Sequence, residues 1–335
     1  MNTLNGINRK KLVVVIVAMV LLEVVVAIVF FSIFPSPASG SVGEDNVTVI
    51  TKLEVGNNYP EVLNVSIEDD AADFSLTPND TTKLTCTSLL RDWNGDGDIN
   101  HTRAELFDNS ESSYGDSEDN NYHYTNSSCN ISSDFGTWNG RSDNEYLALA
   151  NCTFEVEYYA NPENWNCTVE VNDSYGWEDK NSDLISINKL LALGLPDSIN
   201  YGTVNATEVS DENETNVTNY GNVEINLSLS GYAREEGDGL AMNCTLGSDP
   251  NISIEYEKFN LTNSNPSINS LTDFNNVYEN LSSAPTIYDY GLNYRHNDTK
   301  NEAINQTYWR MYVPKGVAGT CQGNIIFGAT EAGQS

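Results

Sequence analysis

The sequence predicts a mostly β protein in which an apolar N-terminal transmembrane helix precedes two antiparallel β-sandwich domains. Three observations lead to this fold class. A long apolar stretch lies near the start of the chain, apolar and polar residues alternate in many short segments after it, and no later segment keeps a helical period over any length. Short strands separated by turn-rich intervals favour sandwiches among the β architectures.

The apolar stretch covers residues 12–34 and contains a single charge, Glu23. A helix of this length extends roughly 34 Å at about 1.5 Å per residue, which exceeds a hydrocarbon core of about 30 Å. Basic residues occupy positions 9–11, and the next one after the stretch is Lys52. The positive-inside rule therefore predicts a single-pass protein of the cell membrane, with residues 1–11 in the cytoplasm and the bulk of the chain outside.

A cleaved signal peptide is the alternative interpretation, with the small residues Ala38-Ser39-Gly40 at the cleavage site. The apolar region of a signal peptide runs about 7 to 15 residues, so the observed length favours a retained anchor. Residues 35–45, rich in Pro, Ser and Gly, then serve as a linker.

Glu23 is costly in the middle of a membrane, by about 2.5 to 3.5 kcal/mol on insertion scales, unless it is protonated or faces protein. The segment VLLEVVVAIVFF around it resembles the start of a mature type IV pilin. That resemblance implies a filament subunit whose apolar helices pack as a core. Pilin precursors are cut directly after a basic stretch, whereas here eight apolar residues, 12–19, follow Lys11.

Composition agrees with an exported body for the rest of the chain. Asp and Glu total 48 against 16 Lys and Arg, a net charge of -32, which excludes nucleic acid as a partner. Nineteen of the 45 Asn residues begin an Asn-x-Ser/Thr sequon, whereas random placement gives roughly 8, so N-glycosylation is predicted. All the sequons follow the apolar stretch: Asn46, Asn64, Asn79, Asn100, Asn126, Asn130, Asn151, Asn166, Asn172, Asn205, Asn213, Asn216, Asn226, Asn243, Asn251, Asn260, Asn280, Asn297 and Asn305.

Six cysteines follow the apolar stretch, with no Cys-x-x-Cys pair among them. An even number in an exported chain favours disulfides over metal or redox chemistry. Cys152, Cys167 and Cys244 each stand in the middle position of a sequon. Because neighbouring side chains of a strand point to opposite faces, a glycosylated Asn facing water places the following Cys in the core.

The first predicted body covers residues 46–186. Apolar residues alternate with polar ones over 84–88, 152–158 and 165–171, which is typical of strands with one solvated face. This body resembles the immunoglobulin-like arrangement in two respects. Cys86 lies on an early strand, and on a late strand Trp165 lies two residues before Cys167. This resemblance implies a Cys86–Cys167 disulfide and leaves Cys129 to pair with Cys152, although four cysteines permit three connectivities. The Trp of that family after the first Cys is not matched, since Trp93 falls in a loop.

The second predicted body covers residues 190–330, with alternation over 223–230, 242–246, 309–313 and 321–327. By elimination, Cys244 pairs with Cys321. The segments 199–204 and 217–223, followed by Val-Pro-Lys-Gly at 313–316, are similar to a sandwich module of archaeal and bacterial surface proteins. The predicted extracellular part as a whole resembles archaeal cell-surface proteins of the immunoglobulin-like kind, which implies architecture more than activity.

One segment, from Asp92 to Asn100, is a candidate metal site. Oxygen ligands at alternate positions and a Gly at the sixth are typical of an EF-hand or dockerin calcium loop. Asp92, Asn94 and Asp96 would bind through side chains and Asp98 through its carbonyl. The twelfth position, where a bidentate carboxylate belongs, is Arg103, so a turn without metal is the alternative.

Nothing else in the sequence indicates a catalytic or cofactor site. The three histidines, His101, His123 and His296, lack metal-ligand spacing, and no nucleophile-elbow motif is present. The predicted function is therefore a cell-surface structural or adhesion protein rather than an enzyme. It would be anchored in the membrane by its N-terminal helix and would associate with itself, with other surface proteins or with glycans. A filament subunit is the first alternative and a surface hydrolase is the second.

Overall fold

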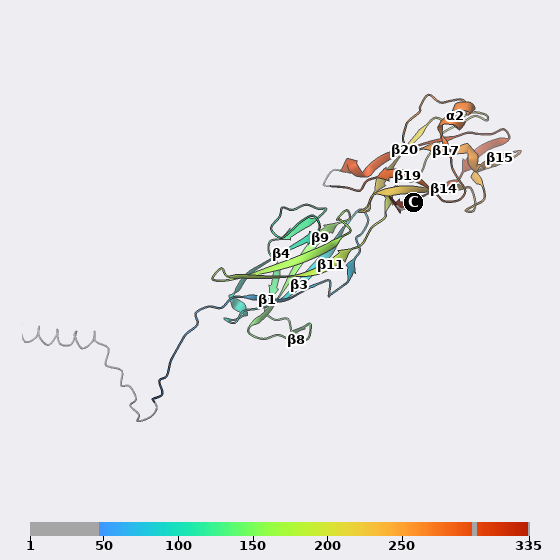
Figure 1. Ribbon diagram of the computed structural model, residues 1–335. Coiled ribbons are helices and arrows are strands. Elements are labelled where there is room, and N and C mark those ends of the chain that lie inside the picture. The colour runs from blue at the N-terminus through green and yellow to red at the C-terminus, as the bar shows by residue number, and fades with distance from the viewer. Residues whose placement is uncertain (1–46, 297–299, 334–335) are drawn as a thin grey trace, which may run out of the picture. The chain divides into compact units, whose positions relative to one another are not determined.

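The computed structural model describes residues 47–296 and 300–333 (Figure 1). The chain falls into two compact units, residues 1–56 and 57–335. Of the first unit only residues 47–56 are described, and they form no strand or helix. The second unit contains all the named strands, and its strand-rich character confirms the prediction of a mostly β protein built from antiparallel sheets.

The first sandwich consists of two sheets that pack face to face. One sheet has the order β1-β3-β9-β6 and the other has the order β2-β11-β10-β4-β5. All their pairings are antiparallel except that of β2 with β11. The strands are β1 Glu61–Ile67, β2 Asp73–Phe74, β3 Thr81–Arg91, β4 Ile99–Asp108, β5 His123–Asn126, β6 Asn130–Ser132, β9 Leu147–Glu157, β10 Asn164–Asp173 and β11 Glu178–Ile187, with the small hairpin β7 Thr137–Trp138 and β8 Arg141–Ser142.

Alternation along the central strands creates the core of this sandwich. Leu84 and Cys86 of β3, Phe154 and Val156 of β9, and Trp165 of β10 all point inward and are almost completely buried. In β10 the period of two continues through the following buried positions, while the residues between them are polar. The predicted strands at 84–88, 152–158 and 165–171 therefore exist and are buried on the expected face, except that β9 ends at Glu157.

The second sandwich has a five-stranded sheet of order β12-β13-β20-β17-β18 facing a three-stranded sheet of order β19-β14-β22, with a further sheet β16-β15-β21. Its core contains Leu227 and Leu229 of β14, Phe259 of β17 and Trp309 of β20. The strands are β12 Leu193–Gly194, β13 Asn213–Asn219, β14 Ile225–Tyr232, β15 Leu240–Gly247, β16 Asn251–Ser253, β17 Glu257–Asn260, β18 Glu279–Asn280, β19 Thr286–Leu292, β20 Ile304–Met311, β21 Val317–Gln322 and β22 Asn324–Glu331.

Helical structure is scarce in the described residues. The short 3₁₀ turns are η1 Asp96–Asp98, η2 Ile254–Tyr256 and η3 Lys300–Ala303, and α2 Leu271–Val277 is an α-helix of seven residues. Ser270 caps α2 by accepting a hydrogen bond from the Asp273 backbone N–H, and Phe274 is its buried residue.

The predicted localisation needs correction. Within residues 47–296 and 300–333, no helix has the length and apolar character that a bilayer crossing requires. A crossing takes about 20 residues, and α2 has seven. The structure therefore does not support a single-pass membrane protein with its N-terminus in the cytoplasm. The predicted tail 1–11, the span 12–34 with Glu23, the linker 35–45, and the sequons at Asn46 and Asn297 lie outside the described residues.

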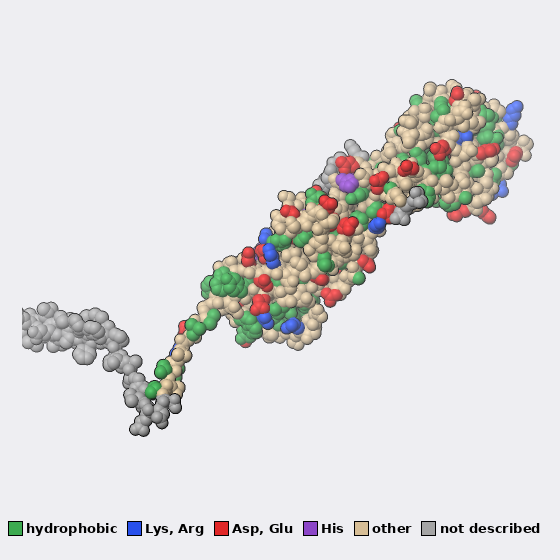
Figure 2. All heavy atoms as spheres, viewed as in Figure 1, with side chains coloured by type: hydrophobic (Ala, Val, Ile, Leu, Met, Phe, Trp, Pro, Cys, Tyr) green, Lys and Arg blue, Asp and Glu red, His purple; other side chains and the backbone are tan. Residues whose placement is uncertain are grey.

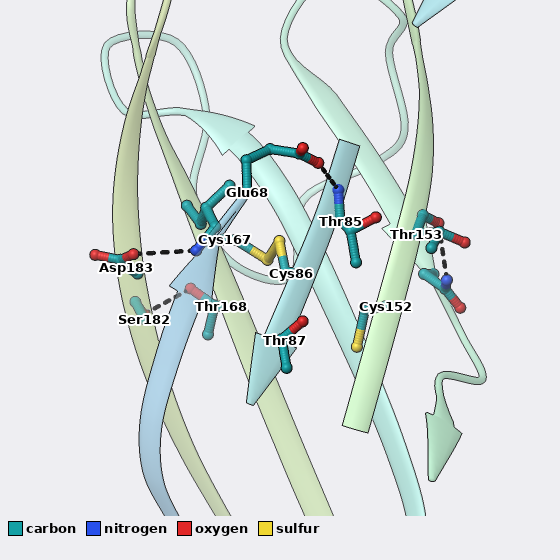
Figure 3. Close-up of a disulfide and its surroundings, with 12 residues drawn as sticks. Glu68, Thr85, Cys86, Thr87, Cys152, Thr153, Cys167, Thr168, Ser182 and Asp183 are labelled. Atoms are coloured by element: carbon teal, nitrogen blue, oxygen red, sulfur yellow. Dashed lines mark hydrogen bonds between the residues drawn. A yellow bond between two sulfur atoms is a disulfide. The ribbon is translucent and has the colours of Figure 1, made fainter. Parts of the chain in front are cut away.

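Three disulfides join Cys86 to Cys167, Cys129 to Cys152 and Cys244 to Cys321. The first two are the pairings that the immunoglobulin-like resemblance implies among three possible connectivities, and the third is the pair left by elimination. The first links β3 of one sheet to β10 of the other across the core (Figure 3), and the third joins directly paired residues of β15 and β21. The three cysteines that follow a sequon Asn are buried, whereas the Asn before each is partly exposed. Because neighbouring side chains of a strand point to opposite faces, the Cys sulfur lies in the core and the sequon Asn lies on the outer face.

Removing the Cys86–Cys167 disulfide should destabilise the first sandwich more than removing Cys129–Cys152. The two closures span 81 and 23 residues, and the chain-entropy model gives about 4.5 and about 3.5 kcal/mol for loops of these lengths. Double Cys→Ala variants of each pair, unfolded in urea, measure the two losses. A loss for the shorter loop equal to or above that for the longer one would contradict this ranking.

Candidate functional site

An acidic cluster lies at one end of the first sandwich, where the loop between β3 and β4 meets the turn between β10 and β11. It contains Asp92, Asp98 and Asp173, each of which places one carboxylate oxygen within 4.8 Å of the others. Asp92 and Asp173 are almost completely buried, at 0% and 1% exposed, and Asp98 is partly exposed. The cluster therefore combines two strand ends that are far apart in sequence.

The loop after β3 is held by its own backbone. The Asp92 N–H donates to the Tyr146 carbonyl at 2.9 Å, and Asp92 Oδ1 accepts from the Asn94 N–H at 2.8 Å, which forms an Asx turn. Gly95 has a φ of 117°, a conformation that side-chain-bearing residues rarely adopt. The 3₁₀ turn η1 follows and ends at Asp98, directly before β4.

The β10–β11 turn brings Asp173 to the same place. Asp173 Oδ1 accepts from the backbone N–H groups of Tyr175 and Trp177, at 2.9 and 2.8 Å. The Ser174 N–H donates to the Asp98 carbonyl at 2.9 Å, and its hydroxyl donates to Asp98 Oδ1. Asn57, the first residue of the second compact unit, donates from Nδ2 to Asp173 Oδ2 at 2.8 Å.

Only part of the predicted metal-ligand set belongs to this cluster. Asp92 and Asp98 are in it, whereas Asp96 is not. Asn94 is exposed and its Oδ1 accepts from the Asn58 N–H at 2.8 Å. Asp173 was missed because it lies 75 positions beyond Asp98, at a distance that no local motif describes. The four-ligand loop of Asp92, Asn94, Asp96 and Asp98 stays a prediction.

The twelfth position of the loop has another role. Arg103 projects from β4 and pairs with Glu170 of β10, with Nε and Oε1 separated by 2.8 Å. Glu105 and Asp108, which could replace a carboxylate there, also have other partners: Glu105 Oε2 accepts from the Gly115 N–H and Asp108 Oδ1 from the Ser110 N–H. The loop therefore does not close in the EF-hand manner.

Like charges and burial shape the electrostatics of the cluster. Burial raises the pKa of Asp92, the Asn94 hydrogen bond opposes this, and the charges of Asp98 and Asp173 raise it further. For Asp173, burial also raises the pKa, but the hydrogen bonds from Asn57 and the turn amides outweigh burial, so the net direction is downward. Three oxygens at this end have no hydrogen-bond partner although they are buried: Asp92 Oδ2, Asp98 Oδ2 and Asn57 Oδ1.

A second buried acid, Glu257, lies in the other sandwich. It lines a cleft of about 400 Å³, together with Thr215 and Tyr201. The Tyr201 hydroxyl donates to Glu257 Oε1 at 2.9 Å, while Glu257 Oε2 and the Thr215 hydroxyl have no partner. Burial raises the pKa of Glu257 to about 8, against a lowering by the Tyr201 hydrogen bond, so this carboxyl is protonated at neutral pH.

A third group has the composition of a hydrolase triad. Ser112 Oγ lies 2.7 Å from His123 Nδ1, and Glu105 Oε2 lies 3.4 Å from His123 Nε2. His123 is completely buried and stacks on Phe107 at a ring-centroid distance of 5.7 Å. None of the three residues lines the Glu257 cleft. The contacts anchor the loop between β4 and β5, and the predicted absence of enzymatic activity stays a prediction.

The predicted glycan acceptors share one property. All seventeen described sequon Asn residues are exposed or partly exposed. The buried Asn residues of the described chain are Asn121, Asn219 and Asn222, and none of them begins a sequon. Figure 2 shows Asp and Glu side chains scattered over the visible face of the described part, with few Lys and Arg between them. Every described sequon Asn therefore reaches solvent, as glycan attachment requires.

Comparisons with known proteins identify no family for this chain. No family model and no curated protein matches it. Among solved structures, it is similar to a chaperone–tip adhesin complex of CFA/I fimbriae, at 12% identity, 82% coverage of each chain and a TM-score of 0.30. It is also similar to the CsuC–CsuE chaperone–tip adhesion subunit complex of Acinetobacter baumannii, at 11% identity, 77% and 96% coverage and a TM-score of 0.34. At these scores the likenesses carry no argument about function.

The stability of the protein should fall as the pH rises from about 5 to about 8, because of Glu257. The folded state holds the proton up to about pH 8, whereas the unfolded chain releases it near 4.5, so the folded state binds more protons between these values. The loss across this window is on the order of 5 kcal/mol. Thermal melts at several pH values, compared with Glu257→Gln, measure it.

Glu257→Gln should flatten this part of the pH profile, because an amide does not titrate. Glu255→Gln, an exposed carboxyl two residues earlier, is the matched control and should keep the slope of the unmodified chain. If Tm fell equally with pH in the unmodified chain and in Glu257→Gln, Glu257 would not be the group responsible.

Proposed function

We propose that this protein is an N-glycosylated structural or adhesion protein of the cell surface, in which two disulfide-stapled sandwiches act as spacers that present glycans and loops. The observation that carries the proposal is the solvent exposure of the sequon Asn residues. Sequons are confined to exposed and partly exposed positions, while the three buried Asn residues lie outside sequons. A glycan can be attached only where the Asn reaches solvent, so this pattern suits a glycosylated surface.

The cysteines support the same compartment. All six form disulfides and none is free. Disulfides persist in oxidising compartments and are rare in the cytosol, so three of them fit a surface structural or adhesion protein. Carboxylates on the exposed loops keep the surface highly charged, which favours a solvated protein over one that packs against anionic surfaces.

We further infer that the first sandwich is of the immunoglobulin-like kind. Its support is the disulfide between the two sheets, with Trp165 completely buried two residues before Cys167. Trp165 contacts Tyr124 at a ring-centroid distance of 5.8 Å, so aromatic packing lies beside the disulfide strand. Trp93, half exposed in the β3–β4 loop, takes no part in this core.

A second candidate function is a subunit of a larger assembly, favoured by residues 47–55. Val49, Leu53 and Val55 are 74%, 88% and 75% exposed, although all three are apolar. They alternate with polar or charged residues for most of the segment, and the segment forms no strand of its own. We propose that two copies of the chain pair these segments as antiparallel strands, Val49 opposite Leu53, which buries the apolar face and satisfies the backbone. Figure 2 shows hydrophobic side chains uncovered along this stretch.

Intact mass spectrometry of material from the natural host tests the glycosylation proposal. The expected mass lies above the 36.9 kDa of the polypeptide by many sugar units. Asn79→Gln and Thr81→Ala disrupt the same sequon by different residues and should remove the same glycan mass. An Asn120→Gln control, outside any sequon, should leave the mass of glycan unchanged. A native mass equal to that of the bare polypeptide contradicts the proposal.

Cysteine cross-linking tests the pairing of residues 47–55. Antiparallel pairing with Val49 opposite Leu53 places Thr51 opposite its own copy, so Thr51→Cys should give a disulfide-linked dimer on mild oxidation. Thr48→Cys is the matched control, because the two copies of residue 48 lie about 20 Å apart in this register. Adding Leu53→Asp should abolish the Thr51→Cys dimer. Equal cross-linking at positions 48 and 51 would exclude this register.

A further inference from the structure

We propose that Asp92, Asp98, Asp173 and Asn57 form a Ca²⁺ site, and that the ion fastens the first residues of the second compact unit to the end of the first sandwich. This ligand set differs from the loop that the sequence predicts, because it takes Asp173 and Asn57 in place of Asn94 and Asp96. The site does not depend on the proposed surface function, so it can fail or succeed independently.

The spacing of the oxygens suits calcium. Ca²⁺ binds oxygen at about 2.3 to 2.6 Å, so two ligands on opposite sides of the ion are separated by at most about 5 Å. The carboxylate oxygens of Asp92, Asp98 and Asp173 all lie within 4.8 Å of one another. Asn57 adjoins this group through its Nδ2, which lies 2.8 Å from Asp173 Oδ2. This separation is close to the span of one Ca²⁺ coordination sphere, so a single ion can serve all three carboxylates.

Unpaired oxygens are the second observation. Asp92 is 0% exposed, and its Oδ2 has neither a hydrogen-bond partner nor access to solvent. Asp98 Oδ2 and Asn57 Oδ1 are likewise buried atoms without a hydrogen-bond partner. A buried oxygen without a partner loses about 1 to 3 kcal/mol of solvation, and more when it is charged. Three such oxygens around one cluster are explained together by one cation.

The charge of the cluster also needs a partner. Three carboxylates repel one another at this distance, and none of the ion pairs of the described residues includes Asp92, Asp98 or Asp173. A divalent cation resolves the repulsion with the carboxylates still ionised.

The donor set selects the metal. All the ligands are carboxylate or amide oxygens, which suit Ca²⁺ and Mg²⁺ and disfavour the softer transition metals. Mg²⁺ requires a near-ideal octahedron at 2.0 to 2.1 Å and keeps several waters. A set of two buried and two partly exposed residues, drawn from three separate segments, instead suits the larger ion with its variable geometry.

The position of the site gives it a structural role. Residue 57 begins the compact unit, and its neighbours contact the same end of the sandwich: the Asn58 N–H donates to Asn94, and Tyr59 stacks on Trp177 at a centroid distance of 4.1 Å. Three segments thus meet at the cluster, namely the start of the unit, the β3–β4 loop and the β10–β11 turn. Ca²⁺ would join all three with one ion.

Terbium luminescence and thermal melting of the full chain, stripped with chelator and titrated with Tb³⁺ or Ca²⁺, test the site. Trp93 and Trp177 lie on the contributing segments, so bound Tb³⁺ should be sensitised. Extracellular calcium modules bind with a Kd on the order of 10⁻⁴ to 10⁻³ M, and roughly tenfold excess over Kd should raise Tm by a few degrees. No response to either ion overturns the proposal, and an equal response to Mg²⁺ overturns the choice of calcium.

Matched substitutions distinguish the two ligand sets. Asp98→Asn and Asp173→Asn should each weaken binding at least tenfold, and Asn57→Ala should weaken it less. Asp96→Asn, with the same charge change in the same loop, should bind as the unmodified chain does. In chelator, Asp98→Asn should melt at or above the Tm of the unmodified chain, because a repulsive charge is gone, which separates loss of the site from misfolding. Loss of binding in Asp96→Asn, with retention in Asp173→Asn, would overturn the proposed ligand set.

Discussion

The covalent link between Cys86 and Cys167 is the contact on which the organisation of the first sandwich depends. It joins the middle of β3 to the middle of β10, so it fixes which faces of the two sheets look at each other. Once Cys167 faces inward, the period of two along β10 also turns Trp165, Val169 and Val171 inward. The same period turns Asn166, the sequon residue, outward. A shift of register by one residue would bury the sequon Asn and expose the sulfur, so the disulfide and the sequon constrain the strand together.

Strand periodicity explains why the architecture was accessible from the sequence. Alternation at 152–158 and 165–171 identified strands and their buried faces, and the even cysteine count indicated disulfides. The helix α2 was missed because it is too short for a hydrophobic period to appear. Ser270 followed three residues later by Asp273 is a capping signal, however, and it was available in the sequence.

Only the residues of the candidate site that lie close together in the sequence were predictable. Asp92 and Asp98 lie in one loop, and their spacing indicated oxygen ligands. Asp173 and Asn57 come to the cluster because β10 pairs with β4 and because the start of the unit runs past the β10–β11 turn. Such long-range pairing is decided by the whole sheet, so neither residue carries a local signal. Glu257 illustrates the same limit, since the alternating acids of Glu255 and Glu257 look alike in sequence but one is exposed and the other is buried.

The distribution of negative charge joins these observations. Most of the acids can remain ionised because they reach solvent, where like charges interact weakly at physiological ionic strength. A few are buried, and their surroundings differ: burial raises the pKa of Glu257 to about 8, Asp173 accepts hydrogen bonds from Asn57 and the turn amides, and Asp92 keeps one oxygen without a partner. Protonation and hydrogen bonding account for the first two. Asp92 differs from Glu257 because its unpartnered oxygen lies where three carboxylates converge, and this convergence is why we propose a cation there.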